Sequence, residues 1–176
     1  RDRLSSMSMS GASNLLTKVF NNSHLKNLGM EGNPSEFGIY LSLIKSNNLH
    51  IKKSDEFVIS IENTNNKSIK IIYDEFLKLI KGSKEAVNVS DIYAHFVKQP
   101  YGIKIGLLPI LIGIFFKATE ASCAFYNKDE QGRESLITEF DQKIAERMYH
   151  MPETLKIMFV KIEGEKQIIL DEFKSY

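Results

Sequence analysis

One segment of the chain is apolar on every side, and it directly follows a short turn. The apolar run extends from Ile105 to Phe116, and Pro100, Tyr101 and Gly102 form the turn before it. A helix that is hydrophobic all round must be buried in a core or against a partner. About a dozen residues are too few for the roughly 20 that a bilayer-spanning helix needs. The pattern predicts a buried helix over residues 103–117 of a soluble module, with no membrane partner.

Apolar residues recur at helical spacing in five further segments. Asn33 and Glu36 are suited to open the second of these helices, as N-cap and capping-box carboxylate. Gly82 is suited to end the third, and Asn88 precedes the fourth. The apolar positions of the five predicted helices are Leu15, Leu16, Val19 and Phe20; Phe37, Tyr40, Leu41 and Ile44; Ile69, Ile72, Tyr73, Phe76 and Ile80; Ile92, Tyr93 and Phe96; and Ile137, Phe140, Ile144 and Met148.

Three short segments have the composition or alternation of β-strands, at Phe57–Ile61, Ser122–Tyr126 and Leu155–Ile162. The polar segment Asn127–Glu134 predicts a turn after the second of them. Two helices joined by a tight turn, then a strand, a polar hairpin and a returning strand resemble a winged-helix arrangement. We therefore predict a mainly α fold with short β-hairpins (α+β), in which a helical N-terminal unit precedes a winged-helix-like unit.

An asparagine-rich segment, Asn63-Thr64-Asn65-Asn66, predicts a linker between two units. Residues 1–62 would form a helical unit with a short strand. Residues 68–176 would form the winged-helix-like domain, built on the apolar helix 103–117. The chain begins at Arg1 without an initiator methionine or an apolar leader, so we expect it to be a fragment whose first partner is the remainder of a larger polypeptide.

The charge balance limits which partners the chain is expected to bind. It contains 23 basic and 22 acidic residues, giving a net charge of +1, and no long block is strongly basic. This balance argues against a free-standing nucleic-acid binder held by a charged patch. The single cysteine, Cys123, excludes an internal disulfide, which fits a cytoplasmic location.

The residue types that perform chemistry are not arranged in a known motif. The chain has no P-loop sequence, and its four histidines and one cysteine do not have metal-ligand spacing. The acidic residues of the polar turn fit a solvated surface, and Cys123 in a predicted strand fits a buried structural thiol. We therefore expect no catalytic residue, no metal and no cofactor in this chain, which is not an enzyme by itself.

Winged-helix domains often bind duplex DNA, so we consider whether this chain could contact it. The second helix of that motif enters the major groove and must expose polar side chains, yet the matching segment carries only Lys104 at its start and Lys117 at its end. Lys98, Lys104 and Arg133, in the turn and the wing, are the candidates for phosphate contacts. Two interpretations stay open, a winged-helix shape used for packing, which is favoured, and a contact with double-stranded DNA.

Several short motifs also occur in a characteristic order. Over most of the chain, from Arg3 to about Phe173, they resemble an internal region of very large bacterial ATP-binding proteins of phage-defence and restriction-type loci, akin to the large ATPase subunits of BREX-like systems. The run from Met7 to Ala12 departs from the small-residue run usual after the Leu-Ser-Ser element. The motifs are Arg1-Asp2-Arg3-Leu4-Ser5-Ser6; Asn27-Leu28-Gly29-Met30-Glu31-Gly32; Pro34-x-Glu36-x-x-x-Tyr40-Leu41-Ser42-Leu43; Pro100-Tyr101-Gly102-Ile103-Lys104-x-Gly106-x-Leu108-Pro109-x-Leu111; Ala124-Phe125-Tyr126; and Pro152-Glu153.

The resemblance implies a non-catalytic region of a P-loop ATPase whose nucleotide-binding loop lies elsewhere in the polypeptide. It carries no catalytic residue onto this chain. The first hypothesis is an interaction and assembly module, which would bind other defence-system subunits, and the alternative is a duplex-DNA contact module of the same type of protein. Under both, Pro100, Tyr101 and Gly102 form a structural turn, with Tyr101 packed beside the apolar helix.

Overall fold

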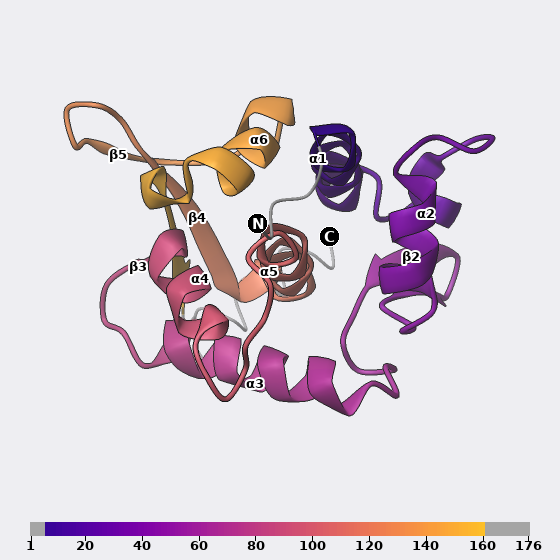
Figure 1. Ribbon diagram of the computed structural model, residues 1–176, viewed down its shortest axis with the longest axis horizontal. Coiled ribbons are helices and arrows are strands. Elements are labelled where there is room, and N and C mark those ends of the chain that lie inside the picture. Colours follow the sequence, from indigo (N-terminus) through magenta and orange to yellow (C-terminus); the bar gives the residue numbers. More distant parts are fainter. Residues whose placement is uncertain (1–5, 161–176) are drawn as a thin grey trace, which may run out of the picture.

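Helix α5 is the axis of the fold, and the other helices and a small sheet surround it (Figure 1). The computed structural model describes residues 6–160, which form a mixed α+β structure with two antiparallel sheets. The helices are α1 (Ser6–Asn21), α2 (Phe37–Ile39) with a π-helical continuation (Tyr40–Lys45), α3 (Lys67–Lys81), α4 (Val89–Val97), α5 (Leu108–Ala118) and α6 (Gln142–His150), and the strands are β1 (His50–Lys53), β2 (Glu56–Ile59), β3 (Val87–Asn88), β4 (Cys123–Lys128), β5 (Glu134–Leu136) and β6 (Leu155–Phe159). Short 3-10 turns lie at Lys26–Gly29, Glu120–Ser122 and Pro152–Thr154.

Helix α5 confirms the prediction of a buried apolar helix. All of its residues from Leu108 to Phe116 are buried. The helix begins at Leu108, later than the predicted residue 103, because the preceding residues form turns in which the Leu107 N–H donates to the Lys104 carbonyl. Pro109 therefore falls in the first helical turn, where its missing N–H costs no intrahelical hydrogen bond.

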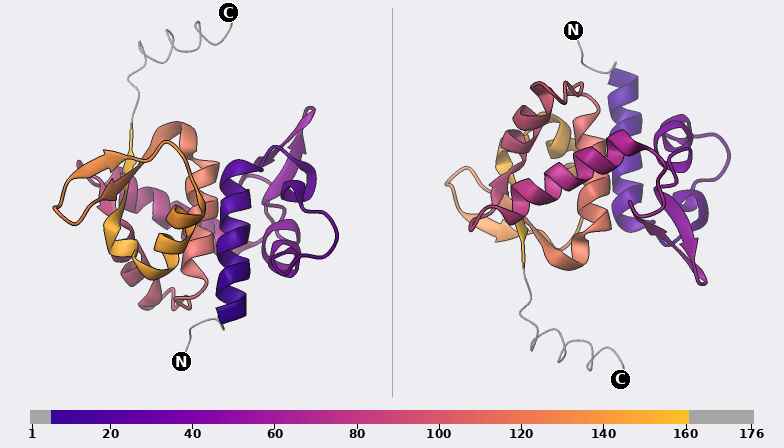
Figure 2. Two further views of the ribbon diagram at one scale, coloured as in Figure 1. Left: turned by 90° about the horizontal axis from the view of Figure 1, so that it is seen from above. Right: turned by 90° about the horizontal axis from the view of Figure 1, so that it is seen from below.

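Helix α1 crosses α5 at a glycine. A Cβ atom placed on Gly113 would lie 2.2 Å from Cδ1 of Leu16, so only a glycine allows this approach without displacing the leucine. Gln142 of α6 also bonds α1, accepting from Thr17 Oγ1 and donating to Ser13 Oγ, both over 3.0 Å. Seen from above, α1 lies between α5 and the α2–β2 region (Figure 2).

The division into two units, residues 1–62 and residues 68–176, stays a prediction. One continuous buried core includes residues from both ranges.

The larger sheet has the strand order β3-β6-β4-β5, with every neighbouring pair antiparallel. Strands β4 and β5 form a hairpin around the predicted polar turn, with Asn127 opposite Ser135. The helix predicted from Ile137 begins only at Gln142, where Asp141 caps it by accepting the Ile144 N–H. The predicted strands at 122–126 and 155–162 correspond to β4 and β6, although residues 161 and 162 lie outside the described range.

The region between α1 and α3 differs from its prediction in two places. Strand β2 corresponds to the predicted Phe57–Ile61, but it pairs with β1, which the sequence did not indicate. The capping box predicted at Asn33 and Glu36 is wrong, because Glu36 itself flanks the helix start and its buried carboxylate accepts a hydrogen bond from Lys18 of α1. Burial alone would raise the pKa of Glu36, but hydrogen bonds and the Lys18 charge outweigh it, and the pKa lies below its ordinary value.

A buried histidine ties β1 to two other segments. His50 Nε2 lies 2.7 Å from the Ser23 carbonyl oxygen, and His50 Nδ1 lies 2.9 Å from the Tyr40 hydroxyl. Because a carbonyl can only accept, Nε2 carries the proton and donates, while Nδ1 accepts from Tyr40. Burial lowers the pKa of His50, and the hydrogen bond to Ser23 opposes this in part. The neutral imidazole is thus the form that the fold accommodates.

We expect the free energy of unfolding to decrease as the pH falls below 6.5, the ordinary pKa of histidine. The pKa of His50 is lower in the folded chain, so in the window below 6.5 the unfolded chain binds more protons and stability rises with pH. Urea denaturation between about pH 5 and pH 8 measures this slope. His50→Gln should flatten it and the exposed control His24→Gln should not. An unchanged slope in His50→Gln would show that another group titrates.

Candidate functional site

The three predicted cations do not form one surface. Lys98 follows α4 and Lys104 lies in the segment before α5, so the structure places both in the α4–α5 turn, and both side chains are exposed. Arg133 lies in the hairpin turn between β4 and β5. The views of Figures 1 and 2 agree that this hairpin turn and the α4–α5 turn lie apart. A single phosphate-binding strip through all three residues is therefore not formed.

Arg133 instead stabilises its own hairpin turn. Its Nε donates to Asp129 Oδ2 over 2.8 Å, and the same carboxylate accepts from the backbone N–H groups of Gln131 and Arg133. The Arg133 backbone hydrogen bond is the main cause that holds the pKa of Asp129 below its ordinary value. The arginine charge is thus offset locally by an ionised aspartate.

Pro100, Tyr101 and Gly102 lie in the segment that connects α4 to α5. The N–H groups of Tyr101 and Gly102 both donate to the Lys98 carbonyl, over 3.1 and 3.0 Å. Gly102 has φ +58°, a left-handed conformation that favours glycine. The Tyr101 ring packs on α4, with ring centroids 5.2 Å from Phe96 and 5.5 Å from His95, whereas the sequence predicted a place beside α5. The turn therefore fixes how the chain leaves α4 and enters α5.

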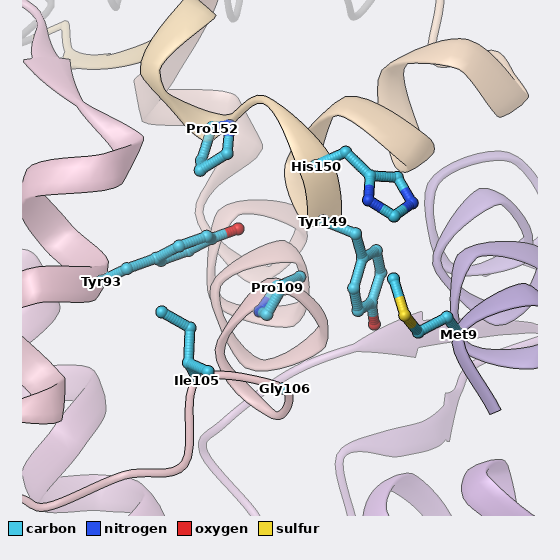
Figure 3. Close-up of a pocket in the computed structure, with 8 residues that line it drawn as sticks. All are labelled: Met9, Tyr93, Ile105, Gly106, Pro109, Tyr149, His150 and Pro152. Carbon is cyan, nitrogen blue, oxygen red and sulfur yellow. The ribbon is translucent and has the colours of Figure 1, made fainter. Parts of the chain in front are cut away.

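A pocket of about 470 Å³ lies beside this turn. Figure 3 shows that its walls come from α1, α4, the turn, the start of α5 and the end of α6. Most of the wall is apolar or aromatic, a composition typical of binding pockets. The residues that line it are Met9, Tyr93, Ile105, Gly106, Pro109, Tyr149, His150 and Pro152.

The two tyrosines of the pocket differ in their hydrogen bonding. The Tyr93 hydroxyl donates to the Met148 carbonyl over 2.9 Å. The Tyr149 hydroxyl is buried and has no hydrogen-bond partner among residues 6–160, and Figure 3 shows it directed toward Met9. Burial raises the pKa of both tyrosines, so both stay neutral. The Tyr149 hydroxyl is thus covered beside Met9, and a molecule in the pocket could reach it only if a neighbouring side chain moved.

Exposed apolar side chains continue outward from the pocket, and we call them the apolar rim. Ile105 is 50% exposed and lines the pocket directly, and Met151, 47% exposed, lies between two lining residues. Val97 is one helical turn beyond Tyr93 on α4 and so lies on the same helix face. Exposed apolar side chains around a pocket are typical of an interaction site. The apolar rim consists of Val97, Ile105, Leu107 and Met151.

The groups with catalytic potential are dispersed. Within the described part of the chain, no three His, Cys, Asp or Glu side chains gather as metal ligands. Burial raises the pKa of Cys123 to about 11, opposed by the charge of Lys81, so this thiol is protonated at neutral pH and is a poor nucleophile. None of the helices formed by residues 6–160 combines the length and apolar character that a membrane span requires. The pocket is the feature with the clearest capacity to bind.

Comparisons with known proteins do not place the chain in a family. No family model matches it, and no curated protein or solved structure is significantly similar to it.

Proposed function

We propose that this chain is a non-catalytic interaction and assembly module of a larger bacterial, defence-associated P-loop ATPase. One observation carries the proposal. Helix α5, which in a winged helix would be the groove-entering helix, is buried from Leu108 to Phe116, with α1 crossing it at Gly113. A helix covered in this way serves packing, and the exposed apolar rim at its N-terminal end is the surface left for a partner.

The order of elements supports a winged-helix origin for the second part of the chain. Helix α3, strand β3, helices α4 and α5, strand β4, the β4–β5 hairpin and strand β6 follow one another, and β6 lies between β3 and β4. Helix α6 is an addition between the hairpin and β6. In this proposal α1 and α6 cover the face of α5 that would otherwise enter a DNA groove. Helix α1 packs on α5 at Gly113, and α6 is hydrogen-bonded to α1.

The larger setting comes from the resemblance to the ATPase subunits of BREX-like systems, which remains a proposal. In such a protein the nucleotide-binding loop would lie elsewhere in the polypeptide. The chain would then serve to dock the remainder of that polypeptide or other defence-system subunits in the cytoplasm.

A second candidate function is a duplex-DNA contact through the α4–α5 turn. Lys98 and Lys104 are both exposed in that turn, and neither has an ion-pair partner in the described residues. Two cations at one turn can contact DNA phosphates without contacting the base edges. Arg133 adds less to this candidate than the sequence predicted, since its charge is paired with Asp129.

Duplex-DNA binding distinguishes the two functions. Fluorescence anisotropy of a labelled duplex is measured at about 50 and 200 mM salt, because phosphate-based binding weakens steeply over this range. For an assembly module we expect no salt-sensitive binding by the chain, and no ATP hydrolysis. Binding at low salt that is lost in Lys98→Ala/Lys104→Ala but kept in the control Arg133→Ala would replace the proposal with the second candidate. ATP hydrolysis by the chain itself would overturn both.

A further inference from the structure

We infer that residues 165–176 of this chain form an amphipathic helix that docks on the outer face of the four-stranded sheet. The inference does not depend on the proposed assembly function, because it concerns the sheet and not the pocket. Three observations lead to it, namely an apolar sheet face that the described residues leave partly exposed, the residue pattern of the segment that follows β6, and the matching lengths of that segment and the strand.

The two faces of the sheet differ in what they contact. Phe125, Leu155 and Ile157 are buried on the face that we call the inner face, and the Phe125 ring meets Phe116 of α5 at a centroid distance of 4.9 Å. Figure 2 shows the sheet at one end of the molecule, with α5 and α1 on the same side of it. Side chains alternate along a strand, and cross-strand partners share a face. The residues between the buried ones therefore point away from α5, onto the outer face.

The outer face is mostly apolar. Ala124 pairs with Met158 and Tyr126 pairs with Leu136, so these four side chains are neighbours on one face. Leu136 is 55% exposed, and the other three are partly exposed. Val160, 41% exposed, extends this face beyond β6, because the chain stays hydrogen-bonded to the residue before β4 there. The solvent face of an antiparallel sheet is normally polar, so an apolar one indicates that a further layer covers it.

The charged groups of the outer face pair with one another. Lys156 of β6 reaches across β4 to Glu134 of β5, and its Nζ donates to Glu134 Oε1 over 2.5 Å. This ion pair lies at the end of the sheet away from Val160. Covering the apolar part of the face would therefore not bury an unpaired charge, which is the expensive case.

The segment that follows β6 carries apolar residues that fit this face. Residues 161–176 lie outside the described range, so the argument from here rests on their sequence. Ile169, Phe173 and Tyr176 recur at the i, i+4, i+7 spacing of one helix face, and Leu170 lies beside them. The positions on the opposite face of such a helix are polar, namely Gln167, Asp171, Lys174 and Ser175. An amphipathic helix of this kind needs an apolar surface to pack on.

The connection and the lengths fit a helix that runs back along β6. Strand β6 has five residues and ends at Phe159, and at about 3.4 Å per residue it is about 17 Å long. A helix over residues 165–176 would be about 18 Å long, at about 1.5 Å per residue. Between them lies Gly164, which can adopt the positive φ that a sharp reversal requires. The covalent link also gives this segment a high effective concentration at the sheet, which favours it over a second copy of the chain.

The inference is tested by NMR on the full chain with ¹³C-labelled methyl groups. We expect nuclear Overhauser effects between the methyl group of Met158 and the methyl groups of Ile169 or Leu170. Ile71 is the control, because it is 60% exposed on α3 and should show no such effects to Met158. Absence of effects between Met158 and both residues of the segment would overturn the inference, and this measurement needs no variant.

A pair of double variants tests the predicted face of the helix. Ile169→Ser/Phe173→Ser should shift the methyl resonances of Ala124 and Met158. It should also raise the fluorescence of the dye 8-anilinonaphthalene-1-sulfonate, on the order of threefold, because the dye binds exposed apolar surface. Gln167→Ser/Asp171→Ser, with the same spacing on the opposite helix face, should change neither. Equal effects of the two double variants, or unchanged resonances in the first, would contradict the inference.

A mixture of labelled and unlabelled chains identifies which molecule supplies the helix. Effects between Met158 and Ile169 that arise within one chain support the inference. Effects that connect a labelled chain to an unlabelled one would show that a second copy covers the outer face, and the inference would be overturned.

Discussion

Replacing Phe116 with alanine should lower the free energy of unfolding by about 3–5 kcal/mol. The ring is 3% exposed and contacts three other phenylalanines, with centroid distances of 6.0 Å to Phe20, 4.9 Å to Phe125 and 5.6 Å to Phe140. These rings come from α1, from β4 and from the segment before α6. The truncation therefore leaves a cavity at the place where three separate parts of the chain meet α5. It also removes aromatic pairs that each contribute about 0.5–1.5 kcal/mol.

Urea denaturation at neutral pH measures this loss, and Ile71→Ala is the matched control. Ile71 is also apolar and helical but is 60% exposed, so its truncation should change the free energy of unfolding by less than about 0.5 kcal/mol. Amide hydrogen exchange should show faster opening of α1 in the Phe116 variant. A loss below about 1 kcal/mol would mean that the cluster does not join α1 to the rest of the core.

The helix starts that the sequence predicted correctly are those decided by neighbouring residues. Asn66 accepts the N–H of Ile69 at the start of α3, and Asn88 accepts the N–H of Ser90 at the start of α4. A cap bond forms within one turn of the chain, so its signal is present in a short stretch of sequence. The burial of helix α5 was also predicted correctly, because an apolar helix must be buried, although the helix begins at Leu108 and not at residue 103.

Two other predicted helix starts are wrong because residues far away in the sequence decide them. The Glu36 carboxylate bonds Lys18, not its own helix, because the side chain is buried against α1. Phe140 was predicted inside a helix, but its ring stacks on Phe20 at 4.2 Å, and α6 begins after it. In both places a tertiary contact outweighs the local pattern.

The pocket could not be predicted for the same reason. The Pro-Tyr-Gly turn was recognised, and its neighbours Ile105 and Gly106 line the pocket. Met9 and Tyr149 line it too, but 140 positions of sequence separate them and no motif links them. The unpaired hydroxyl of Tyr149 is a property of its surroundings, so only the folded structure reveals it. The exposed lysines of the turn were correctly noted, whereas the pairing of Arg133 with Asp129 was missed.

The crossing of α1 and α5 predicts strong coupling between Gly113 and Leu16. Leu16→Ala should cost about 2–5 kcal/mol, since the side chain is fully buried. Gly113→Ala alone introduces a methyl group 2.2 Å from Leu16 Cδ1, a clash worth about 1–3 kcal/mol, partly offset by a gain of about 1 kcal/mol in helix propensity. In the double variant the leucine atoms that clash are gone, and the new methyl group occupies part of the space they leave. The double variant should therefore be about 1–3 kcal/mol more stable than the sum of the single losses predicts.

A double-mutant cycle by urea denaturation measures this coupling energy. Gly38 provides the control, because a Cβ placed there meets no atom within 4 Å. Gly38→Ala combined with Leu16→Ala should be additive within about 0.5 kcal/mol. Additive losses for Gly113→Ala and Leu16→Ala would show that α1 does not rest on α5 in solution. Helix α5 would then have a free face, and the argument that its burial excludes base reading would no longer hold. The stability measurement therefore bears directly on the choice between an assembly module and a DNA-contact module.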